Sequence, residues 1–231
     1  MIEYKKYRKD VLDAAQWLYQ EGYFGSKRGS GGNVSMRVNE AMMAITPSSV
    51  KYFELLMEDI CIVDLDLSMI GENQQSKPSV ESALHSIIYR NRLDVNAIVH
   101  THQLYGSVFS VINTPIPALF DEVAFSLGQS VDVIPYGLSG SPELVDHVAE
   151  KLFNNANAYI LQNHGILALG QDLEKAILHA ELLEKVARIY CLALSTGKPV
   201  TKLPESILEM VKIIRDDEVQ KAKATKDECK D

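Results

Sequence analysis

Short apolar runs alternate with longer segments of helical periodicity along most of this 231-residue chain. Four segments carry apolar side chains every three or four positions and are predicted to be helices: residues 4–22, 79–91, 141–153 and 172–195. A short helix is also expected to end near residue 110. Seven short apolar runs are predicted to be strands: residues 34–38, 42–46, 60–64, 95–99, 131–134, 159–161 and 166–169. Because several strands follow one another closely, we expect a three-layer α/β/α fold with a mixed, mainly antiparallel central sheet.

No repeat or low-complexity linker divides the chain, so we expect one domain over residues 1–231. Apolar residues make up 46% and charged residues 23%, which is ordinary for a globular protein. The polar segment 71–78 is expected to be an exposed loop. The charged residues 216–231 are expected to form a frayed C-terminal tail.

The formal net charge of −8 disfavours partners that are themselves polyanions. We therefore expect no binding to nucleic acid or to an anionic membrane, although a local pocket can still take a small anion. The first residues lack the apolar centre of a signal peptide, and no apolar run is long enough to span a bilayer. Three widely separated cysteines do not form a disulfide framework. These features favour the cytoplasm.

Three of the six histidines follow apolar strands in the sequence. His100 and His102 come directly after the run 95–99, and residues i and i+2 of an extended chain face the same side. His164 follows the run 159–161 and precedes Gly165. Two of these histidines alone could be solvated loop residues. A third at another strand end favours a three-histidine metal site, which suits zinc and leaves one coordination position open.

A carboxylate, Glu81, stands at the start of the predicted helix before the first of these strands. Any acid there is stabilised by the helix dipole, so this position alone does not show a function. The alternative is a carboxylate beside the metal. His85 lies one turn later on the same side of the helix and is predicted to be structural or to support the site. His147 and His179 fall within helices and are interpreted as structural.

Five motifs occur in the order typical of the class II aldolase/adducin family: SGGNVS (30–35), ITPSS (45–49), KPSVESALH (77–85), AIVHTH (97–102) and NHGILALG (163–170). Together they extend the resemblance over about residues 5–195. Within this family, the chain is most similar to members that cleave ketose 1-phosphates such as L-fuculose 1-phosphate. The resemblance implies an α/β/α fold and a homotetramer with active sites at subunit interfaces.

The resemblance also assigns roles to individual residues. It implies zinc on His100, His102 and His164, with Glu81 as fourth ligand at rest and as the group that later handles a proton. It further implies a phosphate pocket, formed by Asn33, Ser48, Ser49 and Ser79. Small neutral donors on loops are consistent with a phosphate that is bound without a large basic patch.

Three positions depart from the family pattern. Val80 replaces a second pocket serine and has no hydrogen-bond donor on its side chain. Ser49 stands where the family has a glycine. The stretch IPALFDEVAFSLG lacks the tyrosine that acts as an acid from a neighbouring subunit, and Asp121 and Glu122 are the candidates near that place. These two acids are otherwise ordinary residues of a surface helix.

The favoured hypothesis is a lyase of carbohydrate metabolism that cleaves a ketose 1-phosphate to dihydroxyacetone phosphate and an aldehyde. The reaction would pass through a metal-stabilised enediolate, with zinc, or Mn²⁺ or Co²⁺ in its place, and with Glu81 as proton shuttle. One alternative is an epimerase, dehydratase or decarboxylase of the same fold that acts on a related or non-phosphorylated substrate. Another is an adducin-like interaction module without catalysis. The motifs do not select one ketose phosphate.

Overall fold

The computed structural model describes residues 4–71 and 76–228 of the chain. Within them, eight strands form one sheet in the order β3-β2-β1-β4-β8-β7-β6-β5. In chain order the strands are β1 Asn33–Asn39, β2 Met42–Ile45, β3 Cys61–Asp64, β4 Ala97–Thr101, β5 Ile116–Pro117, β6 Ser130–Ile134, β7 Ala158–Leu161 and β8 Gly165–Gly170. β6 and β7 pair in parallel, and the other neighbouring strands of this sheet pair antiparallel. The prediction of a mixed, mainly antiparallel sheet is confirmed.

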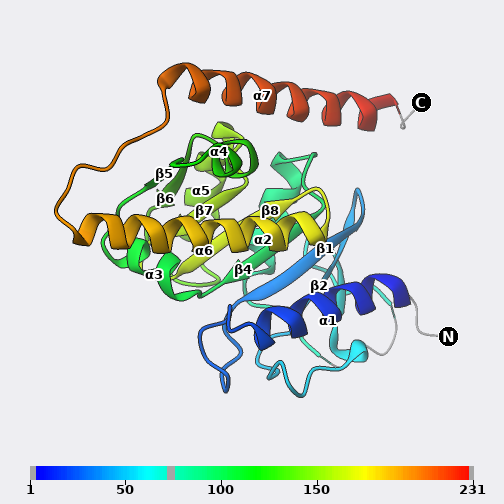
Figure 1. The fold of residues 1–231 in the computed structure, drawn as a ribbon. Coiled ribbons are helices and arrows are strands. Elements are labelled where there is room, and N and C mark those ends of the chain that lie inside the picture. Colours follow the sequence, from blue (N-terminus) through cyan, green and yellow to red (C-terminus); the bar gives the residue numbers. More distant parts are fainter. Residues whose placement is uncertain (1–3, 72–75, 229–231) are drawn as a thin grey trace.

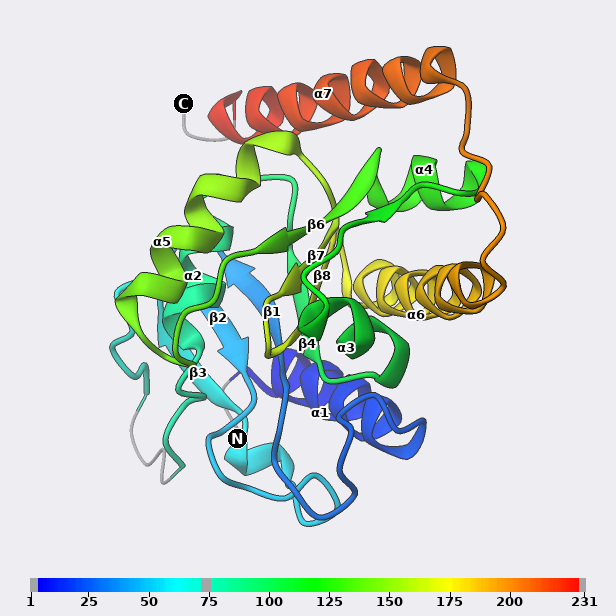
Figure 2. The same cartoon turned by 90° about the vertical axis from the view of Figure 1, so that its left-hand side faces the viewer.

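Helices cover both faces of the sheet, as Figures 1 and 2 show. One face carries α1 Lys5–Gln20, α3 Leu104–Val111, α4 Asp121–Leu127 and α6 Leu173–Ser195. The other face carries α2 Ser82–Asn91 and α5 Pro142–Lys151. Short 3₁₀ turns lie at Met57–Asp59 and Leu152–Asn154. The expected three-layer α/β/α architecture is therefore confirmed.

Strand β8 shows why the central strands appear in the sequence as continuous apolar runs. Successive side chains of a strand point to opposite faces of the sheet. Leu167 and Leu169 pack in the core below α2 and α5, whereas Ile166 and Ala168 face the layer that contains α6. Because both faces are covered by helices, both sets of side chains must be apolar.

The first residues of α5 and α2 show how these two helices begin. At α5, Pro142 takes the first helical position, and the Ser141 hydroxyl accepts a hydrogen bond of 3.3 Å from the Leu144 backbone nitrogen. The helix predicted from residue 79 begins three residues later, at Ser82. A turn precedes it, in which the Ser82 backbone nitrogen donates to the Ser79 carbonyl oxygen.

The C-terminal region differs from the sequence prediction. Helix α7 spans Glu205–Glu228, so the expectation of a frayed tail is wrong for residues 216–228, and residues 229–231 lie outside the described part. Several contacts hold this helix to the domain, including two hydrogen bonds to backbone carbonyl oxygens. The Arg215 guanidinium donates to the Asn155 carbonyl oxygen at 2.8 Å, and Gln129 Nε2 donates to the Leu208 carbonyl oxygen at 2.9 Å. Strand β5 was also not predicted.

The predicted loop 71–78 is only partly described, because residues 72–75 lie outside the described residues. Its end is ordered by a bridge between Pro78 and Pro47. Among residues 4–71 and 76–228, no helix combines the length and the apolarity that a bilayer crossing requires.

Candidate metal centre

The three predicted histidines meet at one end of the central strands. His100 lies on β4, His102 follows this strand, and His164 lies in the turn between β7 and β8. The antiparallel pairing of β4 with β8 places Thr101 opposite Ile166 and so brings this turn to the end of β4. One ring nitrogen from each histidine lies within 4.8 Å of the others. Three imidazoles at this separation can hold one divalent metal ion.

A hydrogen bond and burial give these rings the protonation pattern that suits a metal ligand. His100 Nδ1 lies 2.8 Å from the Ile166 carbonyl oxygen, which can only accept, so Nδ1 carries a hydrogen and Nε2 is the nitrogen left to face a cation. Nε2 of His100 lies 3.1 Å from Nε2 of His102. Burial lowers the pKa of His102 to about 3 and that of His164 to about 4, and the neighbouring His100 adds to both shifts. His102 and His164 are therefore neutral at ordinary pH, and the neutral imidazole is the form that binds metal.

Glu81 completes the cluster from the other side. It occupies the N-cap position of α2 and is 4% exposed. One oxygen, Oε2, lies 3.2 Å from His100 Nε2, and the other, Oε1, lies 3.3 Å from His164 Nε2. Asn33 Nδ2 donates to Oε2 at 2.7 Å, and the Ser139 hydroxyl donates to Oε1 at 2.8 Å. The carboxylate thus has a partner on each oxygen and borders the three rings.

The charge of Glu81 reflects opposing effects. Burial raises the pKa of a carboxyl group, but His100, His164 and the hydrogen bonds from Ser139 and Asn33 outweigh it and lower the pKa to about 2. An ionised carboxylate beside three imidazoles suits a divalent cation with nitrogen and oxygen ligands. The donor set therefore fits the metal that the sequence predicts.

Small residues make room for the histidine rings. A β-carbon at Gly165 would lie 2.5 Å from the Thr101 carbonyl oxygen and 2.6 Å from His102 Cδ2. A β-carbon at Gly31 would lie 2.9 Å from His102 Nδ1. Both glycines belong to motifs that the sequence analysis selected, and their backbones approach His102 more closely than any other residue type permits.

A family model, that of the Class II Aldolase and Adducin N-terminal domain, matches residues 9–191. The chain belongs to the class II aldolase/adducin family. Its relatives include the L-fuculose phosphate aldolase of Escherichia coli strain K12, with 33% identity over 91% of this chain and 94% of that protein. The 5-deoxy-D-ribulose 1-phosphate aldolase of Bacillus thuringiensis serovar kurstaki shares 37% identity over 89% of this chain and 93% of its own length. Both names denote aldolases, which are lyases.

Solved structures support the same assignment for this class II aldolase family member. An L-fuculose 1-phosphate aldolase superposes with a TM-score of 0.82 and 31% identity, over 90% of this chain and 94% of that one. The YgbL protein of Klebsiella pneumoniae, whose description leaves open aldolase, epimerase or decarboxylase, superposes with a TM-score of 0.77 at 25% identity, over 91% and 100% of the two chains.

The predicted phosphate-binding residues of this family member fall into two groups. Ser48, Ser49 and Ser79 lie on two paired segments, because the Ser48 backbone nitrogen donates to the Lys77 carbonyl oxygen at 2.8 Å and the Ser79 nitrogen to the Thr46 carbonyl oxygen at 3.1 Å. Ser48 Oγ and Ser49 Oγ are 3.2 Å apart.

Asn33 differs from these serines, because its amide nitrogen bonds to Glu81 and its Oδ1 is buried without a hydrogen-bond partner in the described residues.

Two of the residues that depart from the family pattern, Ser49 and Val80, can be placed in the structure. Ser49 adopts φ 63°, the left-handed conformation that favours the glycine of the family. The side chain of Val80 is 64% exposed and lies beside the loop that carries Gly140. Val80 therefore gives the approach to Glu81 an apolar side chain where the family has a serine.

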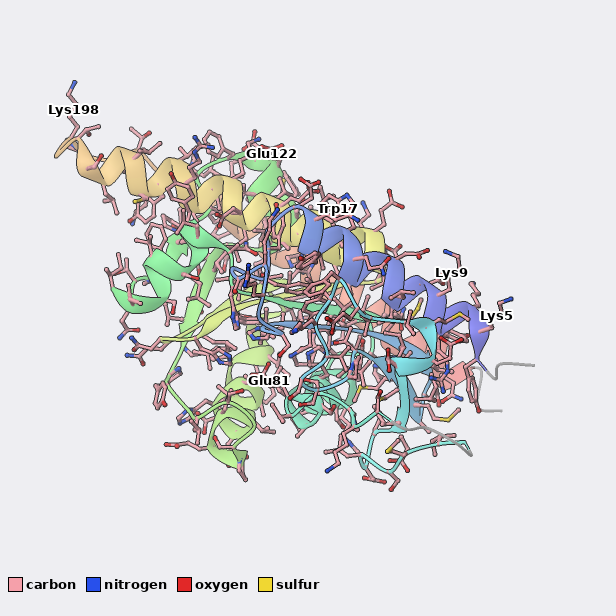
Figure 3. The ribbon with its side chains drawn as sticks, turned by 90° about the horizontal axis from the view of Figure 1, so that it is seen from below. Lys5, Lys9, Trp17, Glu81, Glu122 and Lys198 are labelled. Atoms are coloured by element: carbon pink, nitrogen blue, oxygen red, sulfur yellow. The ribbon has the colours of Figure 1, made fainter. Side chains whose placement is uncertain are left out.

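The two candidate acids of this chain lie away from its own histidine cluster. Asp121 and Glu122 begin α4, and Glu122 forms an ion pair with Lys185 of α6. Figure 3 shows Glu81 and Glu122 on opposite sides of the sheet.

The sequence analysis did not select Ser139. This residue lies in the exposed loop between β6 and α5, and its hydroxyl bonds to Glu81 from 58 positions away. The local pattern, YGLSGS, shows only a loop, so no sequence signal indicates this contact.

Proposed function

We propose that this protein is a metal-dependent aldolase that cleaves a ketose 1-phosphate to dihydroxyacetone phosphate and an aldehyde. The observation that carries the proposal is the cluster of three imidazoles beside the buried carboxylate of Glu81, in a chain of the class II aldolase family. Relatives named for L-fuculose phosphate and 5-deoxy-D-ribulose 1-phosphate support a deoxyketose 1-phosphate as the substrate.

His100, His102 and His164 would hold the metal, with Glu81 as a fourth ligand at rest. We propose zinc, and the same donors also suit Mn²⁺ or Co²⁺. A bound divalent cation supplies a Lewis acid that polarises the ketose carbonyl and offsets the negative charge that develops on the neighbouring carbon. The three rings would hold this cation at one position, because the backbone that carries each ring is itself fixed by the sheet.

Glu81 would carry the proton of the reaction. When the C3–C4 bond breaks, the C4 hydroxyl loses a proton to give the aldehyde, and C3 must gain one to give dihydroxyacetone phosphate. A carboxylate that is 4% exposed and borders the rings can hold this proton away from bulk water. Asn33 and Ser139 orient its two oxygens.

The phosphate would lie at the paired segments of Ser48, Ser49 and Ser79, with Asn33 nearest to the metal. Their hydroxyl and backbone donors suit an anion. Val80 adds an apolar contact at the approach to Glu81, which favours a substrate with a methyl or deoxy carbon.

We further propose a homotetramer of single-domain chains, residues 1–231, in the cytoplasm. Exposed apolar side chains on and after α3, at Leu104, Val111 and Ile112, support a contact between copies close to the site. Ser110 of this helix accepts a hydrogen bond from the His164 backbone nitrogen. In such a contact, Asp121 or Glu122 of a neighbouring copy could supply the acid. The free thiols of Cys61 and Cys191 suit a reducing compartment.

The decisive experiment assays metal-depleted protein after addition of Zn²⁺, Mn²⁺ or Co²⁺. The panel contains L-fuculose 1-phosphate, 5-deoxy-D-ribulose 1-phosphate, their non-phosphorylated forms and a non-phosphorylated hydroxy acid, and the readouts are dihydroxyacetone phosphate and CO₂. Metal-dependent release from the phosphorylated sugars alone supports the proposal. Turnover only of a non-phosphorylated acid, with release of CO₂, would instead indicate a decarboxylase. Protein that binds none of the three metals would indicate a non-catalytic, adducin-like module.

A further inference from the structure

A polar stripe on α2 faces a polar stripe on β1 within an otherwise apolar layer of the core. On α2 the polar residues are four positions apart and so share one side of the helix. On β1 they are two positions apart and so share one face of the strand. We name this arrangement the polar ladder, formed by Asn33, Ser35, Arg37, Glu81, His85 and Tyr89, each at most 8% exposed.

The ladder has three rungs. The first is the bond of 2.7 Å from Asn33 to Glu81. In the second, Ser35 Oγ lies 2.6 Å from His85 Nδ1 and 2.7 Å from the Tyr89 hydroxyl oxygen. A serine hydroxyl has one hydrogen and two lone pairs, so it can bond to both.

The third rung joins Arg37 to Tyr89. The guanidinium donates to the Tyr89 carbonyl oxygen at 2.7 Å, and its carbon lies 4.7 Å from the centre of the Tyr89 ring.

The spacing of the rungs determines the register of α2 along β1. Four helical residues advance about 6.0 Å, and two strand residues advance about 6.6–6.8 Å. Successive rungs therefore match to within about 1 Å, which lets all three form at once. A helix shifted along the strand would break every rung together.

This register acts directly on the candidate metal centre. Asn33 lies opposite His100 in the pairing of β1 with β4, so the first rung stands beside a proposed ligand. Glu81 has no side-chain capping bond to its own helix. The second and third rungs thus set where the first turn of α2, and with it the carboxylate, lies relative to His100.

Stability alone does not account for the ladder. Buried polar groups are unfavourable unless each is hydrogen-bonded, and an apolar stripe would pack this helix without that penalty. The penalty is also not fully removed, because His85 Nε2 is buried without a hydrogen-bond partner in the described residues.

We propose that Ser35, His85 and Tyr89 are positioning residues that hold α2 in the register at which Glu81 faces His100 and His164. This inference rests on the proposed function, since only there is Glu81 the group that handles the proton.

The test is a double-mutant cycle of wild type, Ser35→Ala, Glu81→Gln and the double variant. We expect Ser35→Ala to lower kcat about 10²-fold, as misplacement of a reacting group by about 1 Å can do, with KM little changed. In the Glu81→Gln background the same change should alter kcat less than about twofold, because no competent carboxylate remains to be misplaced. An equal loss of kcat in both backgrounds would overturn the proposal.

Ser86 provides a matched control. It is a buried serine of the same helix, but its hydroxyl donates to the Leu65 carbonyl oxygen and takes no part in the ladder. Ser86→Ala should leave kcat within about twofold of wild type, since it removes a buried hydrogen bond without shifting the register. A loss as large as that of Ser35→Ala would show a general effect of helix damage and would also overturn the proposal.

A crystal structure of metal-free Ser35→Ala gives a readout independent of activity. We expect the Glu81 carboxylate to have left its bond to Asn33, whereas in Ser86→Ala this bond remains. If Ser35→Ala leaves the carboxylate in place, the ladder does not position it. Tyr89→Phe removes a single hydroxyl from the same rung and serves for both experiments if Ser35→Ala does not fold.

The outcomes separate this inference from the proposed function. Wild-type protein that cleaves no ketose 1-phosphate, or Glu81→Gln protein with full activity, contradicts the proposed function. Even then, the crystal structures of metal-free Ser35→Ala and Ser86→Ala decide whether the ladder positions Glu81.

Discussion

Gly165 and His102 are packed so closely that a β-carbon on the glycine would lie 2.6 Å from Cδ2 of the imidazole ring. The same β-carbon would lie 2.5 Å from the backbone oxygen of Thr101, which cannot move without β4. The glycine therefore belongs to the construction of the metal centre as much as the histidines do.

Replacement of this glycine should displace a metal ligand. We expect Gly165→Ala to weaken Zn²⁺ binding about 10–100-fold, the range seen when groups that support metal ligands are changed. Titration against a competing chelator measures the affinity. Gly29→Ala is the control, because its β-carbon would meet Ser26 at an ordinary 3.4 Å. Equal affinities in both variants would contradict the expectation.

Loss of one imidazole should remove the metal altogether. We expect His102→Ala protein to bind no stoichiometric zinc and to have no turnover, because two imidazoles and a carboxylate no longer form the three-histidine site. Elemental analysis after dialysis tests this directly. His147→Ala, on α5, should retain both metal and activity. Metal retained in the His102 variant would remove this residue from the ligand set.

Neutralisation of the carboxylate should separate catalysis from metal binding. Glu81→Gln keeps the shape of the side chain but cannot carry the proton, so kcat should fall about 10²–10⁴-fold while most of the metal stays bound. Steady-state kinetics with parallel metal analysis provides the measurement. Full activity in this variant would exclude Glu81 from the mechanism.

The serine segments should recognise phosphate rather than the sugar. Ser48→Ala removes a donor, and a lost hydrogen bond to a charged group of about 1.5–3 kcal/mol corresponds to a decrease of kcat/KM of about 10–150-fold. The decrease should appear for the phosphorylated ketose and not for residual turnover of its dephosphorylated form. Ser195→Ala, at the exposed end of α6, is the control. A similar decrease for both substrates would argue against a phosphate contact at Ser48.

His179 should make the protein sensitive to acid. It is 6% exposed, its Nδ1 lies 2.6 Å from the Leu169 carbonyl oxygen, and burial lowers its pKa to about 4. The unfolded chain, with an ordinary pKa near 6.5, binds the proton first as pH falls. The stabilising contribution is therefore complete above about pH 6.5. This contribution to the free energy of unfolding is lost as the pH falls from about 6.5 to about 4, by up to about 1.4 kcal/mol per pH unit.

Urea unfolding of metal-free protein at about pH 7 and about pH 5 measures this loss. His179→Asn keeps a donor for Leu169 but does not titrate, so its free energy of unfolding should change less between the two conditions than that of wild type. An identical change in both proteins would show that His179 is not the group responsible.

Local patterns predicted the elements that carry the metal centre. Strands β4 and β7 lie within two residues of their predicted bounds, because buried strands appear in the sequence as short apolar runs. Helix α7 was missed for the opposite reason. Half of its residues are charged, and its place depends on distant contacts such as that of Arg215 with Asn155.

The sequence alone determined that His100 and His102 point the same way, because this follows from the alternation of three consecutive residues in an extended chain. The need for glycine after His164 comes instead from contacts with Thr101 and His102 in the folded chain. Only the tertiary structure decided which groups complete the cluster around Glu81. Asn33 lies 48 positions from Glu81 and Ser139 lies 58 positions away. Contacts over such separations depend on how strands align and where loops return, which the order of residues along a single segment does not report.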